Sequence, residues 1–156
     1  MLTTRIKRVK VKPFAFLYGE KETDMSDIPK NGGKIMDKLT PFMRKHKVGI
    51  AGPCVWVYKH LGKGKVRLRA GFPVVMETVA KGLPGKAFSV SKEPAWECYG
   101  TEYAGAMDRI KEAWDEFHGK LGKKGLKPAK NFREVYLKWI DFASPENVTE
   151  LQVQVK

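Results

Sequence analysis

The order of hydrophobic patterns along this chain repeats once, and the repetition constrains the fold more than any single motif. An extended segment, an amphipathic helix, an aromatic strand and a closing strand follow one another over about residues 5–77. The same order returns over about residues 86–156. Duplicated β-α-β-β units predict an α+β fold, with antiparallel sheets, two long helices on one side, and a ligand groove at the pseudo-twofold axis.

Both helices are indicated by their apolar spacing. The first should begin at Asp27, a capping residue, with Pro29 in its first turn, and should end near 48–49. Pro41 should kink or restart it. The second helix is predicted from apolar residues at steps of three and four: Tyr103, Met107, Ile110, Trp114, Phe117 and Leu121.

The extended segments at about 5–18 and 86–100 are predicted as strands, and Pro13 should break or bend the first. The chain of 156 residues suits one domain, 1–156. It contains no apolar run long enough for a transmembrane helix and no secretory signal, which predicts a cytoplasmic protein with no membrane association. Cys54 and Cys98 should be reduced, partly buried thiols.

The net charge of +13 raises the question of nucleic-acid binding. The basic residues are spread along the whole chain, without a recognisable DNA- or RNA-binding motif, so a solvated basic surface is favoured over sequence-specific DNA binding. Arg67 and Arg69 should face water on a hairpin. No Walker loop, HExxH or GxSxG motif occurs, and the three histidines lack metal-site spacing. We therefore expect no metal and no cofactor.

The strand NFREVYLKW, residues 131–139, carries a carboxylate in an aromatic setting. Glu134 and Tyr136 point to one side, with Phe132, whereas Val135 and Leu137 point to the other. Pattern alone leaves open whether Glu134 faces solvent or a cavity. In a cavity it would need hydrogen bonds or a cation, and a carboxylate among aromatic rings suits a lipophilic cation.

Tryptophan and tyrosine are more frequent here than packing requires, which suggests a wall for a flat ligand. When the two repeats are aligned, Trp56 falls opposite Glu134 and Tyr58 opposite Tyr136. The candidate ligand-binding residues are Glu134, Tyr136, Trp56, Tyr58, Phe72, Trp96, Tyr103, Met107 and Tyr18.

Several segments in this order resemble the GyrI-like small-molecule-binding domain, which is also the effector-binding module of AraC- and MerR-type multidrug-response regulators. These segments are GPCVWVY (52–58), AGFPV (70–74), CYGTEYAGAMDRIKEAW (98–114), REVYLKW (133–139) and TELQVQV (149–155). The resemblance implies that Glu134 lies at the bottom of an aromatic pocket and meets cationic drugs. Tyr136, Trp56 or Tyr58, Trp96 and Tyr103 would line that pocket.

The domain begins near residue 5, so the chain resembles the stand-alone members of that family. Three functions stay open. The first is a binding protein that sequesters or senses hydrophobic, aromatic or cationic drug-like molecules. The second is a hydrolase of cyclopropane-type genotoxins that uses Glu134 and Tyr136. The third is a protein-interaction module such as a gyrase modulator. The expected assembly is a monomer or homodimer with a possible protein partner.

Overall fold

The computed structural model describes residues 2–127 and 130–155, and the chain divides into two compact units. The N-terminal unit is Lys12–Ala95, and the C-terminal unit combines Met1–Val11 with Trp96–Lys156. Each unit contains antiparallel strands and one long helix. The expected α+β fold with duplicated elements is confirmed.

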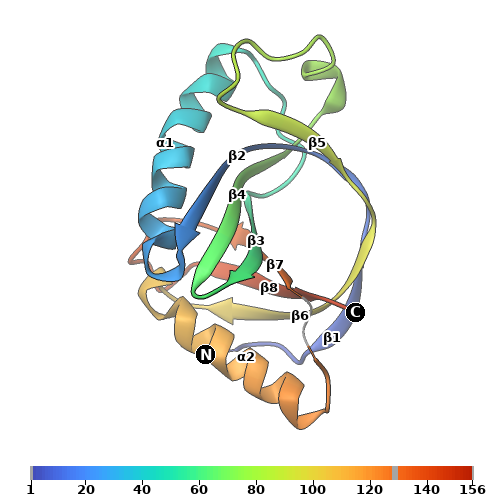
Figure 1. Ribbon diagram of the computed structural model, residues 1–156, viewed down its shortest axis with the longest axis vertical. Helices are drawn as coiled ribbons and strands as arrows, with labels where there is room; N and C mark the ends of the chain where they lie inside the picture. Colours follow the sequence, from blue (N-terminus) through green and yellow to red (C-terminus); the bar gives the residue numbers. More distant parts are fainter. Residues whose placement is uncertain (1, 128–129, 156) are drawn as a thin grey trace. The chain divides into compact units, whose positions relative to one another are not determined.

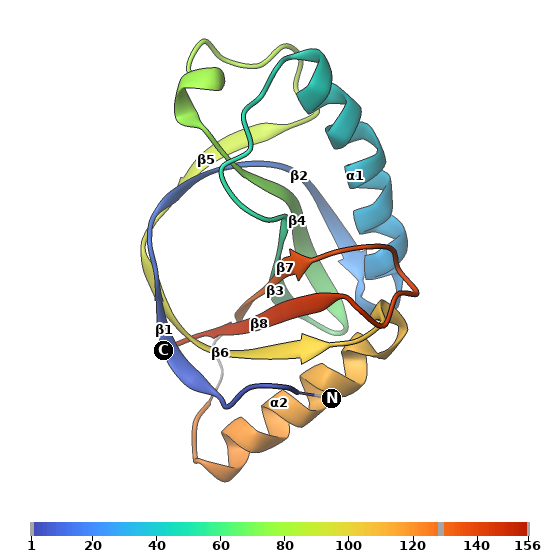
Figure 2. The ribbon, with the colours of Figure 1, turned by 180° about the vertical axis from the view of Figure 1, so that it is seen from behind.

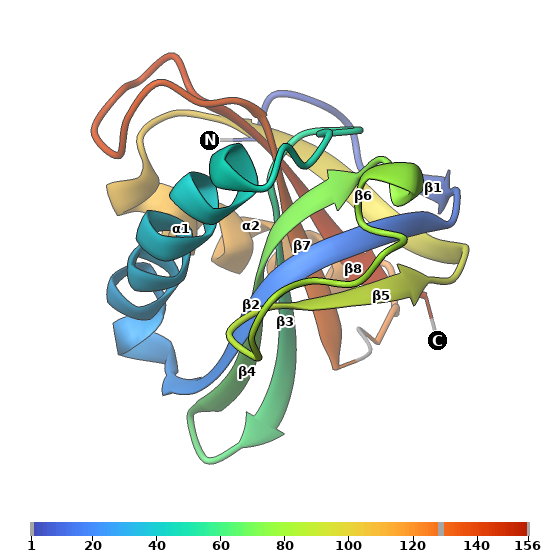
Figure 3. The ribbon, with the colours of Figure 1, turned by 90° about the horizontal axis from the view of Figure 1, so that it is seen from above.

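The N-terminal unit is a four-stranded antiparallel sheet covered by one helix. Its elements are β2 (Phe14–Asp24), α1 (Ile28–Lys45), β3 (Val55–Gly62), β4 (Lys65–Val74) and β5 (Ser89–Glu93), and the strand order is β3-β4-β2-β5. Helix α1 lies along β2 and β4 on one face of the sheet (Figures 1 and 3). A buried cluster under the helix contains Leu17, Leu39, Met43, Val74 and Val79.

The C-terminal unit has the same plan. Its elements are β1 (Lys7–Val11), β6 (Trp96–Ala104), α2 (Ile110–Lys123), β7 (Asn131–Lys138) and β8 (Val148–Gln154), and the strand order is β1-β6-β8-β7 (Figure 2). Short 3-10 turns precede the long helices at Met25–Asp27 and Met107–Arg109, and another follows β4 at Met76–Thr78.

Two prolines mark where the chain passes from one unit to the other. Pro13 separates β1 from β2, and Pro94 separates β5 from β6. The extended segments expected at 5–18 and 86–100 are therefore each two strands, one in each unit. Proline has no backbone N–H to donate to a sheet, which explains why both breaks fall there. As a result, β1 pairs with β6 and β5 pairs with β2.

The two helices depart from expectation in different ways. Helix α1 has Pro29 in its first turn as expected, but Asp27 makes no capping side-chain hydrogen bond and the helix continues through Pro41. The expected start of the second helix at Tyr103 is wrong, because Tyr103 belongs to β6 and α2 begins only at Ile110.

A folded-back tyrosine accounts for the late start of α2. The Tyr103 hydroxyl donates a 2.7 Å hydrogen bond to the Ala106 carbonyl oxygen. A Cβ atom at Gly105 would lie 2.5 Å from that hydroxyl, so the turn needs glycine. Tyr103 and Met107 are four positions apart, as on one face of a helix, but they are not on a common helix. Both are apolar because both are buried. No helix in the described part of the chain is long and apolar enough to cross a membrane.

Candidate ligand-binding site

Strand β7 turns Glu134 toward the protein interior. Phe132, Glu134 and Tyr136 are all buried, and they pair across the strand with Val153, Leu151 and Thr149 of β8, which are buried as well. Glu134 is only 4% exposed. If Glu134 faced solvent, Leu137 would face the interior, but Leu137 is exposed. The question left open by the sequence pattern is therefore answered in favour of a buried carboxylate.

Two neutral donors hold the Glu134 carboxylate. The indole Nε1–H of Trp114 donates to Oε2 at 2.6 Å, and the hydroxyl of Tyr136 donates to Oε1 at 2.6 Å. Hydrogen bonds to an ionised acceptor are short and about twice as strong as neutral ones. They offset the several kcal/mol that burial of a carboxylate costs. The arrangement keeps a carboxylate in an apolar region.

Aromatic rings surround the first of these donors. The Trp114 ring lies 5.8 Å from Phe117, 5.6 Å from Phe132 in an edge-on arrangement, and 5.5 Å from His118. Residues three and four apart on a helix share one face, which explains why α2 presents Trp114, Phe117 and His118 together. Aromatic faces attract cations as well as apolar groups.

Trp114 was not among the expected site residues. In the sequence it is one position of the apolar stripe that predicts α2 and the last residue of the segment 98–114 that resembles the GyrI-like domain. A signal was available, because a buried indole needs an acceptor for its N–H. Glu134 could not be assigned as that acceptor from the sequence, since the two residues are on different elements and separated by 20 positions.

Two further expected residues lie on the sheet face that carries Glu134. Tyr103 pairs with Thr149 on β8, and Thr149 pairs in turn with Tyr136. The Thr149 hydroxyl points to the sulfur of Met107 at 3.9 Å. Burial is the main cause that raises the pKa of Tyr103, and the charge of Asp108 adds to it. Tyr103 and Met107 therefore belong to the packed layer next to Tyr136.

Trp96 lies on the other face of the same sheet. Its ring stacks with the guanidinium of Arg133, whose central carbon is 3.8 Å from the ring centroid. Arg133 alternates with Glu134 along β7 and so points away from α2. The structure does not bring Trp96 together with the Glu134 carboxylate.

The expected residues of the N-terminal unit also divide between two faces. Trp56 packs under α1, where a Cβ atom at Gly32 would lie 2.2 Å from its ring. Tyr58 is buried two residues along the same strand face, and Phe72 packs against the buried cluster under α1. Tyr18 lies on the opposite face, where it stacks on Phe16 at 5.2 Å.

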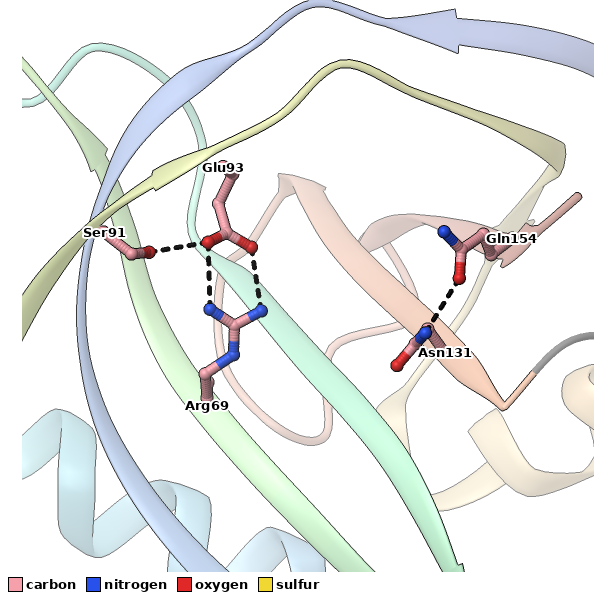
Figure 4. Close-up of polar contacts among 5 residues, drawn as sticks. All are labelled: Arg69, Ser91, Glu93, Asn131 and Gln154. Carbon is pink, nitrogen blue, oxygen red and sulfur yellow. Dashed lines mark hydrogen bonds and ion pairs between the residues drawn. The ribbon is translucent and has the colours of Figure 1, made fainter.

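A polar cluster occupies that opposite face of the N-terminal unit. The guanidinium of Arg69 donates to both carboxylate oxygens of Glu93, at 2.8 and 3.1 Å, and the Ser91 hydroxyl donates to Glu93 at 2.6 Å (Figure 4). The guanidinium also lies 5.0 Å from the Tyr18 ring centroid. The expectation that Arg69 faces water is wrong, because its guanidinium pairs with Glu93 of β5. The sequence pattern could not indicate this pair, since the two residues are 24 positions apart.

The C-terminal unit carries a smaller polar contact on its own sheet. The side-chain amide of Asn131 donates to Oε1 of Gln154 at 2.8 Å, joining β7 to β8 (Figure 4). Among the residues that the structure describes, no group of three histidine, cysteine, aspartate or glutamate side chains could hold a metal ion.

Comparison with known proteins supports the fold. The sequence matches no protein-family model, and a search of the curated proteins finds no match. Solved structures do resemble it. SAV2435 bound to tetraphenylphosphonium has a TM-score of 0.71 at 12% identity, covering 98% of this chain and 94% of that one. The C-terminal domain of EcmrR has a TM-score of 0.69 at 16% identity, covering 97% of both chains.

A third structure is that of a hydrolase encoded by lin2189 from Listeria innocua. It has a TM-score of 0.61 at 16% identity, covering 99% of this chain and 93% of that one. At these identities the likeness concerns the fold. This chain has the same α+β fold as these structures, which agrees with the expected GyrI-like fold.

Proposed function

We propose that the protein binds lipophilic cations and that Glu134 is the counter-ion for their positive charge. The observation that carries this proposal is a carboxylate only 4% exposed, with one oxygen hydrogen-bonded to Trp114 and the other to Tyr136. Both of these donors are neutral groups, and their hydrogen bonds stabilise the negative charge of the carboxylate. A cation that reaches the carboxylate gains Coulomb attraction in a region of low dielectric constant.

The aromatic side chains define the rest of the ligand. Phe132, Phe117 and Trp114 offer flat apolar surfaces and the negative faces of their rings. A small hydrated cation would lose its water shell and gain little contact with these rings. A cation that carries aryl or alkyl groups would pack them against the rings instead. The Trp114 or Tyr136 side chain must move aside, because the carboxylate is otherwise covered.

The fold is compatible with this role, because SAV2435, a protein of the same fold, has been solved with tetraphenylphosphonium. The net charge of +13 repels cations at long range. Selectivity for a positive charge would therefore depend on short-range contacts with Glu134. Sequestration or sensing of such compounds is the biological activity that we propose.

Thermal unfolding tests the proposal. Wild type and Glu134→Gln would be compared with tetraphenylphosphonium and with neutral triphenylphosphine oxide. A ligand at 100 times its dissociation constant stabilises the folded state by about 2.7 kcal/mol, which for a domain of this size raises the melting temperature by roughly 5–10 °C. We expect that shift with the cation and its loss in Glu134→Gln.

The matched control is Glu116→Gln, which removes a carboxylate from α2 that pairs with Lys120 at the surface. This variant should keep the full cation-induced shift. Equal shifts with the neutral compound, or an undiminished shift in Glu134→Gln, would contradict the assignment of Glu134.

A second candidate function, hydrolysis, is favoured by the contact between the Tyr136 hydroxyl and the Glu134 carboxylate. A carboxyl group and a phenol that share a hydrogen bond can exchange a proton with a strained ring or with water. The Listeria innocua hydrolase has the same fold. Turnover of a cyclopropane-containing electrophile that is lost in Glu134→Gln, while the folded state persists, would support catalysis over binding alone.

A further inference from the structure

Three large apolar side chains are exposed close together in the connection between β7 and β8. Trp139 is 50% exposed, Ile140 48% and Phe142 50%. We call these three residues the outer patch. Single exposed apolar residues are normal on proteins, but three within four consecutive positions, two of them aromatic, mark a surface that contacts something.

Hydrogen bonds fix the loop that carries the outer patch. The buried Asn147 accepts from the Ile140 backbone N–H at 2.9 Å and donates to the Asp141 carbonyl oxygen at 2.7 Å. The Phe142 carbonyl oxygen accepts from the Met107 N–H at 2.9 Å, at the turn that leads into α2. These hydrogen bonds fix the backbone of the loop at Ile140, Asp141 and Phe142.

The outer patch is continuous with the candidate site. The Trp139 ring packs edge-on against the Tyr136 ring, with centroids 5.7 Å apart and an interplanar angle of 67°. The hydroxyl at the far end of the Tyr136 ring donates to Glu134. A chain of contacts therefore links the buried carboxylate, through the buried Tyr136 ring, to the exposed Trp139.

Residues 138–147, which carry the outer patch, include one lysine and two carboxylates, a net charge of −1. Lys138 pairs with Glu146 at 3.6 Å, and the Asp141 carboxylate accepts from the backbone N–H of Ala143 at 3.0 Å. An anionic membrane would be attracted by unbalanced lysines around exposed apolar residues. The excess positive charge of this chain is not gathered here. The surroundings suit an uncharged apolar group better than a lipid headgroup.

We infer that the outer patch is a subsite for the apolar tail of the ligand whose cationic head pairs with Glu134. The inference rests on the proposed function and narrows its ligand class to amphiphilic cations, such as quaternary ammonium compounds with a long alkyl chain. Tyr136 separates the head-group region from the tail region, touching Glu134 with its hydroxyl and Trp139 with its ring.

A chain-length series tests this inference. Binding of butyl-, octyl- and dodecyltrimethylammonium would be measured by calorimetry, below micelle-forming concentrations, for wild type and for Trp139→Ser/Phe142→Ser. A fully buried methylene strengthens binding by about fourfold, and one on a half-exposed surface by about twofold. The dodecyl chain has four more methylenes than the octyl chain, so wild type should bind the dodecyl compound roughly 16-fold more tightly.

In Trp139→Ser/Phe142→Ser this gain should fall below about threefold, whereas butyltrimethylammonium should bind as to wild type. The matched control is Ile50→Ser, which removes an exposed apolar residue, 58% exposed, from the N-terminal unit. It should keep the full chain-length gain. Circular dichroism and the melting temperature verify that each variant is folded. Phe142→Ser alone provides a milder variant.

The outcomes separate the two proposals. If Glu134→Gln binds all of the compounds as tightly as wild type does, both the proposed function and the subsite are overturned. If none of them binds wild type while tetraphenylphosphonium does, only the subsite is overturned. If binding depends on Glu134 but the chain-length gain survives in Trp139→Ser/Phe142→Ser, only the subsite is overturned. The subsite is likewise overturned if that variant loses self-association or vesicle binding while its chain-length gain is unchanged.

Discussion

The indole nitrogen of Trp114 lies 2.6 Å from Oε2 of Glu134, so a side chain of α2 is hydrogen-bonded to a carboxylate of β7. This contact joins the helix to the sheet of the C-terminal unit through a buried charge. It also makes the position of α2 sensitive to whatever approaches the carboxylate. Its energy can be measured directly, because phenylalanine keeps an aromatic ring and removes the donor.

Trp114→Phe should lower the free energy of unfolding by about 1.5–3 kcal/mol, the range for a hydrogen bond to a charged group. In a Glu134→Gln background the same replacement should cost less, because a neutral amide is a weaker acceptor. Urea denaturation of the four proteins of this double-mutant cycle measures the difference. Equal costs in both backgrounds would mean that the contact contributes packing and no charge-assisted hydrogen bond.

Gly32 and Gly33, adjacent in α1, should respond to alanine in opposite directions. A Cβ atom at Gly32 would lie 2.2 Å from the Trp56 ring, whereas none of the described atoms lies within 4 Å of a Cβ at Gly33. Gly33→Ala should stabilise the protein by about 0.5–1 kcal/mol through helix propensity. Gly32→Ala should destabilise it by about 1–3 kcal/mol through overpacking. Melting temperatures that move in the same direction would contradict this packing of Trp56.

The Arg69–Glu93 pair should contribute far more to the free energy of unfolding than the Arg8–Glu97 pair. The first is bidentate and largely buried, and the second is exposed. Glu93→Gln leaves the largely buried Arg69 guanidinium without this counter-ion, which should lower the free energy of unfolding by about 2–4 kcal/mol. Glu97→Gln should cost less than about 1 kcal/mol. Chemical denaturation of the two variants side by side provides the comparison, and similar losses would refute the difference in burial.

Burial of Cys98 makes stability depend on alkaline pH. Burial raises the pKa of its thiol from 9.0 to about 12, with a contribution from the charge of Glu150 in the same direction and an opposing one from Arg133. The folded state therefore keeps a proton that the unfolded chain releases above pH 9.0. The stabilisation is complete below that pH and is lost as the pH rises toward about 12.

Cys98→Ala should remove this dependence. The free energy of unfolding of wild type should fall more steeply than that of Cys98→Ala between pH 9 and about 12, by up to about 1.4 kcal/mol per pH unit. The lost packing volume shifts the variant by an amount that does not vary with pH. Subtraction of the two urea-denaturation profiles isolates the thiol, and a flat difference across this range would show that it titrates normally.

Local patterns in the sequence were enough to predict the repeated order of strands and helices. Pro29 at the start of α1 and Pro13 between two strands act through their own backbone chemistry, which does not depend on distant residues. The same locality explains why the order of elements and the resemblance to the GyrI-like domain were confirmed. It also explains why the start of α2 was misplaced, because the turn at Gly105 depends on where the Tyr103 hydroxyl folds.

Tertiary structure alone decided which polar side chains are buried and which partners they have. The alternation along β7 placed Glu134 and Tyr136 on one face, but both faces offered apolar residues, so their direction depended on α2 and β8. Trp114 became a partner of Glu134, and Arg69 a partner of Glu93, through contacts between elements far apart in sequence. A strand's periodicity fixes which side chains share a face, whereas the burial of that face is decided by the elements that pack on it.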